Sequence, residues 1–255
     1  MKDSPYFKQA ELMLKAIPPV AAETCFALKG GTAINLFVRD MPRLSVDIDL
    51  TYLPVDEPRE TALKGISEAL SHIAAAIRKT VPGSKVQESH AQKPERIAKL
   101  VVSVGQTRIK IEPNEVIRGS VFPVEEHDLT QRAQDMFELS VTARTLSVAD
   151  LYGGKLCAAL DRQHPRDLFD IHYLLAQEGI GDAVCGDALK SGWCFKKMEC
   201  CGGFPGWVGS VAAGVLFCAA RVSRSDCRRE YAPLPLQAFD QRYVGGQDRI
   251  GVQLG

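Results

Sequence analysis

The chain has 255 residues, of which 45% are hydrophobic and 24% are charged, and its formal net charge is zero. This length suits one large domain or two small ones, and the composition is typical of a soluble globular protein. The charge excludes binding of nucleic acid by bulk basic character, although a local basic patch is still allowed. The N-terminal residues carry acids at Asp3 and Glu11 and no long apolar core, which predicts no secretory signal and a cytoplasmic location.

Four elements are predicted over the first 80 residues. They are a helix at 6–17, a short helix at 32–38, a strand at 44–51 and an amphipathic helix at 59–80. The first helix is expected to end before Pro18-Pro19, because proline lacks a backbone donor and clashes with the preceding turn. The second is expected to begin just after Gly30-Gly31, and Asp56 is the expected cap of the fourth element.

Two strands and two helices are predicted farther along the chain. They are strands at 97–104 and 107–112, a helix that starts behind the capping-box-like "SVAD" and ends near residue 162, and a helix at 165–177. This order predicts an α+β fold, with a mixed sheet followed by a helical C-terminal part. We expect a first domain over residues 1–140, the start of a helical domain over 141–180, and an atypical Gly/Cys-rich tail over 181–255.

The tail differs in composition from the rest of the chain. It holds six of the eight cysteines: Cys185, Cys194, Cys200, Cys201, Cys218 and Cys227. Without a Cys-x-x-Cys spacing or a histidine, this clustering does not predict a metal site. Residues 202–220 carry no charge and are long enough for a membrane span, but their glycines favour a packed or irregular segment. A tail read out of frame relative to an ancestral gene is a third interpretation.

Two carboxylates lie on one face of the predicted 44–51 strand. Its apolar and polar side chains alternate, so Asp47 and Asp49 share the polar face with Ser45. Acids so close together repel each other and lose solvation, and a divalent cation that prefers oxygen ligands, Mg²⁺ or Mn²⁺, would compensate them. Glu112 lies on the polar face of a later strand. If the two strands pair, the three acids would converge on a two-metal site suited to phosphoryl or nucleotidyl transfer.

Gly30 and Gly31 fit the same chemistry. Glycines at the start of a helix let a triphosphate approach the backbone closely, and the free N–H groups and the helix dipole would bind its phosphates. Ser45 would add a hydroxyl contact. Each feature also has a plainer reading, since paired glycines are common in turns and alternate aspartates are common on solvated strand faces.

The stretch "LKGGTAINLF", followed by "RLSVDIDL", resembles the opening motif of the DNA polymerase β-like nucleotidyltransferase superfamily. The closer resemblance is to the AbiEii toxin family, which includes the MenT toxins of mycobacteria. Four motifs carry it in order: Gly30, Gly31, Arg43, Ser45, Asp47, Asp49 and Leu50; then Lys110 and Glu112; then Lys155; then Arg166, Asp167 and Asp170. Together they lie within residues 25–177.

The resemblance implies a minimal nucleotidyltransferase domain that bears the metal-binding acids and a helical domain that closes over the nucleotide. It implies transfer of a nucleoside monophosphate from an NTP, release of pyrophosphate, and modification of tRNA 3′ ends, as in characterised toxins of this kind. It also implies a cognate antitoxin and a role in a toxin–antitoxin or phage-defence system through abortive infection. Members usually continue in helices after the last motif, whereas this chain continues in the Gly/Cys-rich tail.

Roles of single residues also follow from the resemblance. Asp47, Asp49 and Glu112 would be metal ligands, and Glu112 would bridge a metal or accept the proton of the attacking hydroxyl. Lys155 would contact the NTP phosphates as a point charge and take part in catalysis. The other expected nucleotide-binding residues are Gly30, Gly31, Ser45, Lys110 and Arg166.

The last motif leaves two interpretations open. Asp167 would orient Lys155 or bind the nucleotide and so belong to the catalytic set. Alternatively, Asp167 and Asp170 would cap and brace the 165–177 helix from its first turn, where acids favour the helix dipole. His164 and His172 are expected to be structural or exposed, because no second ligand lies at metal spacing.

Two other functions are weighed against nucleotidyl transfer. "DIDLT" fits the Asp-x-Asp-x-Thr motif of haloacid-dehalogenase-type phosphatases, in which the first aspartate attacks phosphate. That fold needs the acids at the C-terminal end of a strand, whereas the alternation here runs through them to Leu50. The other alternative is a catalytically inactive module that binds nucleotide or a partner.

A basic surface is predicted near the acids. It would be built from Lys93, Arg96, Lys99, Arg108 and Lys110. Such a surface would steer the phosphates of an RNA acceptor. Its plainer reading is a solvated strand face.

Overall fold

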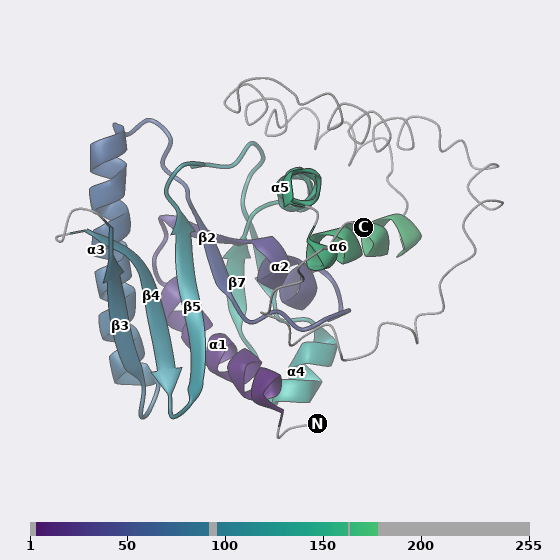
Figure 1. The fold of residues 1–255 in the computed structure, drawn as a ribbon, viewed down its shortest axis with the longest axis horizontal. Coiled ribbons are helices and arrows are strands. Elements are labelled where there is room, and N and C mark those ends of the chain that lie inside the picture. The colour runs from purple at the N-terminus through teal and green to yellow at the C-terminus, as the bar shows by residue number, and fades with distance from the viewer. Residues whose placement is uncertain (1–3, 92–95, 163, 178–255) are drawn as a thin grey trace, which may run out of the picture. The chain divides into compact units, whose positions relative to one another are not determined.

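The computed structural model describes residues 4–91, 96–162 and 164–177, all within one unit of the chain, Met1–Val208. Its strands are β1 (Phe26–Lys29), β2 (Ile48–Tyr52), β3 (Lys85–His90), β4 (Ile97–Val104), β5 (Thr107–Asn114), β6 (Glu125–Asp128) and β7 (Thr142–Thr145). They form one sheet in the order β3-β4-β5-β2-β1-β7-β6 (Figure 1). The β1–β7 and β2–β5 pairings are parallel and the others antiparallel, so the predicted α+β fold with a mixed sheet is confirmed.

Helices pack on both sides of this sheet's central region. They are α1 (Pro5–Ala21), α2 (Gly30–Thr32), the π-helix η1 (Ala33–Val38), α3 (Arg59–Thr80), α4 (Gln131–Phe137), α5 (Val148–Arg162) and α6 (Pro165–Gln177). Helix α1 contacts β5, α3 contacts β4, and the two helices contact each other, so both cover the same face behind β3–β5 in Figure 1. Helix α5 contacts α6, α2 and η1. The glycine motif therefore meets α5, which in turn packs against α6.

The apolar side of the sheet fixes which way the acids point. Ile48 and Leu50 of β2 and Ile111 of β5 are fully buried in the core. Burial of one such side chain contributes roughly 1.5–3 kcal/mol to folding, so this alternation is strongly specified. Because neighbouring strand residues point to opposite faces, Asp49 and Glu112 lie on the face away from α1 and α3.

The predicted end of the first helix is wrong. Helix α1 continues through Pro18 and Pro19 to Ala21, and the N–H of Ala22 donates to the carbonyl of Pro18 at 3.1 Å. Pro19 and Val20 are buried. The burial of this last turn in the core offsets the backbone hydrogen bonds that the prolines cannot make.

The predicted boundaries around the glycines and the first aspartate also need correction. The helix begins at Gly30 rather than after Gly31, and it continues as a π-helix in which Arg39 donates to the carbonyl of Ile34, five residues back. The strand predicted at 44–51 begins only at Ile48, and Leu44 is 37% exposed. Apolar alternation alone overextended the strand, because residues 44–47 bond to the helical turn rather than to a neighbouring strand.

Other predictions are confirmed with small changes. Helix α3 and strand β4 have the predicted bounds, and β5 extends two residues farther, to Asn114. Asp56 is not the cap of α3, because Pro58 occupies that position without a side-chain bond. The "SVAD" cap is present: the N–H of Asp150 donates to Ser147 Oγ at 3.1 Å, and the Ser147 hydroxyl donates to the Asp150 carboxylate at 3.1 Å.

The Gly/Cys-rich tail, its cysteines and the uncharged stretch at 202–220 lie outside the described residues. Within the described part of the chain, no helix is both long and apolar enough to cross a lipid bilayer. The division into residues 1–140, 141–180 and 181–255 stays a prediction.

Candidate active site

A row of charged residues crosses the centre of the sheet. Asp49 of β2 is paired with Lys29 of β1 on one side and with Glu112 of β5 on the other. Neighbouring strands lie roughly 4.8 Å apart and paired residues point to the same face, so the two carboxyl groups are close neighbours. On the far side of Glu112, Lys99 of β4 forms an ion pair with it at 3.4 Å. The two acids are therefore flanked by a lysine at each end.

The positive charge of the nearby lysines does not fully compensate the burial of the Asp49 carboxylate. Burial raises the pKa of its carboxyl above the usual range, and the nearby carboxylates of Asp47 and Glu112 raise that pKa further. Lys29 and Lys155 act in the opposite direction and lower it, but the net shift is upward. A perturbed acid of this kind, placed beside a second acid, is typical of a functional site.

The two glycines are needed for side-chain clearance as much as for backbone conformation. Gly30 has a φ of +72°, and a Cβ atom there would lie 2.6 Å from Oδ2 of Asp49. A Cβ atom on Gly31 would lie 2.7 Å from Nη2 of Arg43 and 3.1 Å from Oγ of Ser45. The Gly-Gly pair thus lets a helix start directly against the motif that contains the acids.

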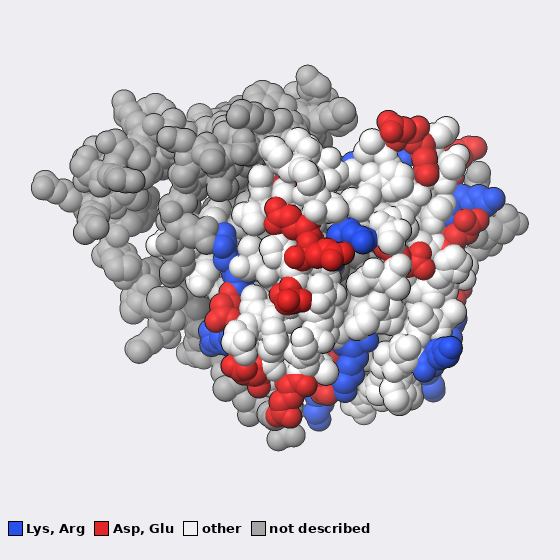
Figure 2. Space-filling view, turned by 180° about the vertical axis from the view of Figure 1, so that it is seen from behind, with Lys and Arg blue, Asp and Glu red and all other residues white. Residues whose placement is uncertain are grey.

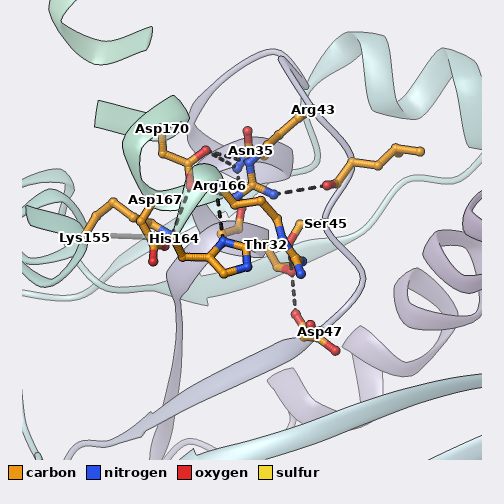
Figure 3. A network of polar contacts seen from close by, with 12 residues as sticks. Thr32, Asn35, Arg43, Ser45, Asp47, Lys155, His164, Arg166, Asp167 and Asp170 are labelled. Carbon is orange, nitrogen blue, oxygen red and sulfur yellow. Dashed lines mark hydrogen bonds and ion pairs between the residues drawn. The ribbon is translucent and has the colours of Figure 1, made fainter. Parts of the chain in front are cut away.

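Thr32 fastens the segment before β2 to this helical turn. Its hydroxyl donates to Oγ of Ser45 at 3.0 Å and lies within hydrogen-bond distance of the carbonyl of Asp47 (Figure 3). Ser45 is 9% exposed, and the side chain of Asp47 is half-buried one residue before β2. Thr32 therefore fixes the backbone that presents Asp47.

A buried ionic network lies next to the glycine turn (Figure 3). Arg43 donates from Nε and Nη2 to the two carboxylate oxygens of Asp170, at 2.7 and 2.6 Å. Lys155 contacts Asp167 at 2.9 Å and Asp170 at 3.0 Å, and its side chain is 7% exposed. Asn35 also donates to Asp170, at 3.3 Å. Asp170 is thus the common acceptor of three side chains.

The predicted nucleotide-binding residues occupy different environments. Lys110 is exposed on β5, on the same face as Glu112. Arg166 is exposed in the first turn of α6, where its backbone N–H donates to Nδ1 of His164 at 3.2 Å. Asp167 is 2% exposed and contacts Lys155, as the orienting interpretation requires. Its direct contact with a nucleotide stays a prediction.

Three residues of this region had no role in the sequence reading. Arg43 was seen only as a motif member, and Asn35 and Thr32 were not noticed. An arginine that belongs to a motif together with aspartates is a signal that it pairs with an acid, but the identity of Asp170 as that acid depends on tertiary packing.

The donor set fits a divalent cation in its chemistry. Asp47, Asp49 and Glu112 offer carboxylate oxygens, and burial, with a contribution from the neighbouring carboxylates of Asp47 and Glu112, raises the pKa of Asp49. The strand pairing that was expected to bring Glu112 beside Asp49 is observed. However, no three acids, histidines or cysteines among residues 4–91, 96–162 and 164–177 lie close enough together to form a ready-made metal site.

The haloacid-dehalogenase interpretation does not fit this geometry. It requires the acids at the C-terminal end of a strand, whereas Asp47 precedes β2 and Asp49 is its second residue. A nucleophilic aspartate would therefore not open a loop above the sheet.

A comparison with models of protein families identifies the family to which the chain belongs. The family model described as the nucleotidyl transferase AbiEii toxin of a type IV toxin–antitoxin system matches residues 12–241. Among solved structures, the chain is similar to "MenT4, nucleotidyltransferase toxin Rv2826c from Mycobacterium tuberculosis H37Rv", with 16% identity and a TM-score of 0.49. That match covers 71% of this chain and 60% of the other, so it spans less than two thirds of that toxin. A search of curated proteins gives no significant match.

Proposed function

Because this chain belongs to the AbiEii family of nucleotidyltransferase toxins from type IV toxin–antitoxin systems, we propose that it transfers a nucleoside monophosphate from an NTP to an RNA 3′ end. The expected acceptor is tRNA. The observation that supports this most strongly is Asp49, held beside Glu112 with a raised pKa and directly against Gly30.

The proposed reaction is an in-line displacement at the α-phosphorus. The acceptor's 3′ oxygen forms a bond to that phosphorus, the bond from phosphorus to the oxygen bridging to the β-phosphate breaks, and pyrophosphate leaves. Glu112 takes the proton of the attacking hydroxyl. Its side chain is 41% exposed, so an acceptor can reach it from solvent.

The acids Asp47, Asp49 and Glu112 would hold Mg²⁺ or Mn²⁺. A bound divalent cation would stabilise the negative charge on the phosphates. Within the chain itself, Thr32 fixes the backbone at Asp47, and the β2–β5 pairing places Glu112 next to Asp49. These contacts hold the ligands' backbones in position before any ion binds.

The NTP phosphates would lie against the glycine turn and Lys155. Two acids orient the Lys155 ammonium, and among the described contacts one N–H is left for a phosphate. Gly30 and Gly31 allow the phosphates to approach the backbone, and Ser45 and Lys110 supply further donors. Arg166, exposed at the start of α6, would bind the outer phosphates.

The partners follow from the family. A type IV toxin–antitoxin system includes an antitoxin, and we propose a cognate antitoxin protein as this chain's regulator. Modification of tRNA would take place in the cytoplasm, where abortive infection would limit phage growth.

A transfer assay tests this function. Purified protein, magnesium and each of the four α-labelled NTPs would be incubated with total tRNA, with Asp47→Ala, Asp49→Ala as the paired control. Label on tRNA only with wild type would support nucleotidyl transfer and identify the nucleotide. NTP binding without any transfer would contradict it and favour an inactive binding module.

A further inference from the structure

One face of the β3–β4–β5 hairpin layer is not used by α1 or α3. Side chains on this open face form rows across the strands, set by the strand register. The first row is Lys85, Ser103 and Arg108; the second is Gln87, Val101 and Lys110; the third is Ser89, Lys99 and Glu112. The third row continues into Asp49, so the open face leads directly to the proposed reacting centre.

The open face is basic away from the acids. Lys85, Arg108 and Lys110 are exposed, and no ion pair to any of them occurs among the described residues. Within the three rows, Glu112 is the only acid. Two lysines of the predicted basic cluster behave differently from this trio, since Lys99 is paired with Glu112 and Lys93 lies outside the described residues.

Among the described residues, the side of the sheet that α1 and α3 cover carries charges of both signs. Figure 2 shows acidic and basic side chains interspersed there. On α3, Lys64 pairs with Glu68 at 3.8 Å, and Arg78 pairs with Glu88 of β3 at 2.9 Å. A polyanion therefore meets charges of both signs on that side, and on the open face it meets three exposed cations without ion pairs among the described residues.

We propose that the open face of β3–β5 binds the 3′-terminal strand of the acceptor RNA, with its backbone running along β5. This rests on the proposed function, because the terminal hydroxyl is placed at Glu112 and Asp49. Alternate residues of a strand are roughly 6.6 Å apart, so Lys110 lies one step and Arg108 two steps from Glu112. These two cations bind successive phosphates inward from the 3′ end, and Lys85, which lies across Ser103 from Arg108 in the same row, binds a phosphate farther along the RNA.

The charge on this face also matches the occupant. Single-stranded RNA presents one phosphate per nucleotide. Removing a cation that neutralises one phosphate reduces the slope of log binding constant against log salt concentration by about 0.7. The open face supplies Lys110 and Arg108 along β5 and Lys85 across the sheet in the row of Arg108, and the polar neighbours Gln87 and Ser89 can donate to sugar or phosphate oxygens. We call the surface formed by Lys110, Arg108 and Lys85 the acceptor track. On this surface the 3′ end of the RNA lies at Glu112 and the chain runs toward Arg108.

Direct binding of RNA tests the track without requiring transfer. Fluorescence anisotropy would measure the affinity of the full chain for a single-stranded RNA with the 3′ sequence of tRNA. Arg108→Gln with Lys110→Gln should weaken binding about tenfold or more and reduce the salt slope by about 1.4. Lys64→Gln with Lys79→Gln, on exposed positions of α3, is the matched control and should leave both unchanged. Equal effects of the two pairs, or no effect of the first, would overturn the proposal.

Neutral linkages test the polarity. A methylphosphonate at the first internucleotide linkage from the 3′ end removes the phosphate assigned to Lys110. On that RNA, Lys110→Gln should cost no further affinity, whereas on RNA neutralised at its 5′ end the full loss should return. A full loss on both RNAs would overturn the assignment.

The outcomes separate this track from the reaction itself. If the wild type binds RNA through Arg108 and Lys110 but transfers no nucleotide to it, the proposed function fails and the RNA surface stands. If transfer occurs, Arg108→Gln alone, at a residue with no assigned contact to the NTP, should raise KM for RNA and leave KM for NTP unchanged. Transfer with an unchanged KM for RNA would overturn the track alone.

Discussion

Arg43 and Asp170, which are 127 residues apart in the sequence, form a two-point ion pair with N–O distances of 2.7 and 2.6 Å. The Asp170 side chain is 1% exposed, and it also accepts from Lys155 and Asn35. The segment before β2, the π-helix and α5 are therefore tied to α6 through one carboxylate. The position of Lys155 depends on all of these contacts.

Removal of the Asp170 carboxylate should destabilise the fold and leave Lys155 less firmly positioned. Asp170→Ala leaves the largely buried cation of Arg43 and the buried cation of Lys155 without a shared partner, and we expect a loss of about 3–5 kcal/mol in the free energy of unfolding. Urea denaturation would measure it. Lys15→Ala, which removes an exposed pair with Glu11, is the matched control and should cost less than about 1 kcal/mol. Similar losses for the two variants would contradict the buried network.

Gly30→Ala should affect the site more than a comparable glycine change elsewhere. The new Cβ would lie 2.6 Å from Oδ2 of Asp49, and the positive φ costs an alanine about 1 kcal/mol in either case. Asp49 must then move, and transfer activity should fall at least tenfold. The control is Gly83→Ala, where φ is +71° and no atom lies within 4 Å, so only the backbone cost applies.

A double variant separates the clash from the backbone cost. In an Asp49→Ala background, Gly30→Ala should destabilise the protein by about the same amount as Gly83→Ala, because the clashing carboxylate is gone. An undiminished cost in that background would show that the clash with Asp49 is not the cause.

Titration of Asp49 should make the free energy of unfolding decrease as pH rises. Because burial raises the pKa of Asp49 in the folded state above the usual aspartate value of 3.8, the folded state keeps a proton that the unfolded state has lost. Stability therefore falls as pH rises from about 3.8 through the folded pKa, at about 1.4 kcal/mol per pKa unit. Asp49→Asn avoids this loss and should be more stable than wild type at pH 7 but not at pH 3.

Urea unfolding of both proteins across this interval measures the difference. Glu68→Gln, at a side chain that is 61% exposed, is the matched control and should follow wild type at every pH. Added magnesium should stabilise wild type and leave Asp49→Asn nearly unchanged, since a cation that binds only the folded state adds to its stability. A stability gap that does not vary with pH would contradict the assigned cause.

Local patterns were enough to predict the elements that carry the acids. In β5, Ile109 and Ile111 alternate with Arg108 and Lys110, and burial follows that alternation. The same rule failed ahead of β2, because apolar residues such as Leu44 can alternate without a neighbouring strand to pair with. Short strands such as β1, with three buried residues in a row, show no alternation and were missed.

The sequence does not predict which strands and helices lie next to one another at the site. That Glu112 would lie beside Asp49 was a conditional expectation, which needed the strands to be neighbours and in register. The Arg43–Asp170 pair and the placement of Lys155 depend on how α5 and α6 pack, and no local period encodes that. The resemblance marked which residues mattered, and tertiary packing determined which of them touch.

The most direct test of the central claim is nucleotide transfer by Asp49→Asn. Wild type and variant would be incubated with the labelled NTP, magnesium and tRNA, and the label would be located by digestion from the 3′ end. Because the variant is expected to be the more stable protein at pH 7, unfolding cannot explain a loss of activity. We predict 3′-terminal label with wild type and at least a hundredfold less with Asp49→Asn. Undiminished transfer by the variant would contradict the assignment of this acid to the reacting centre.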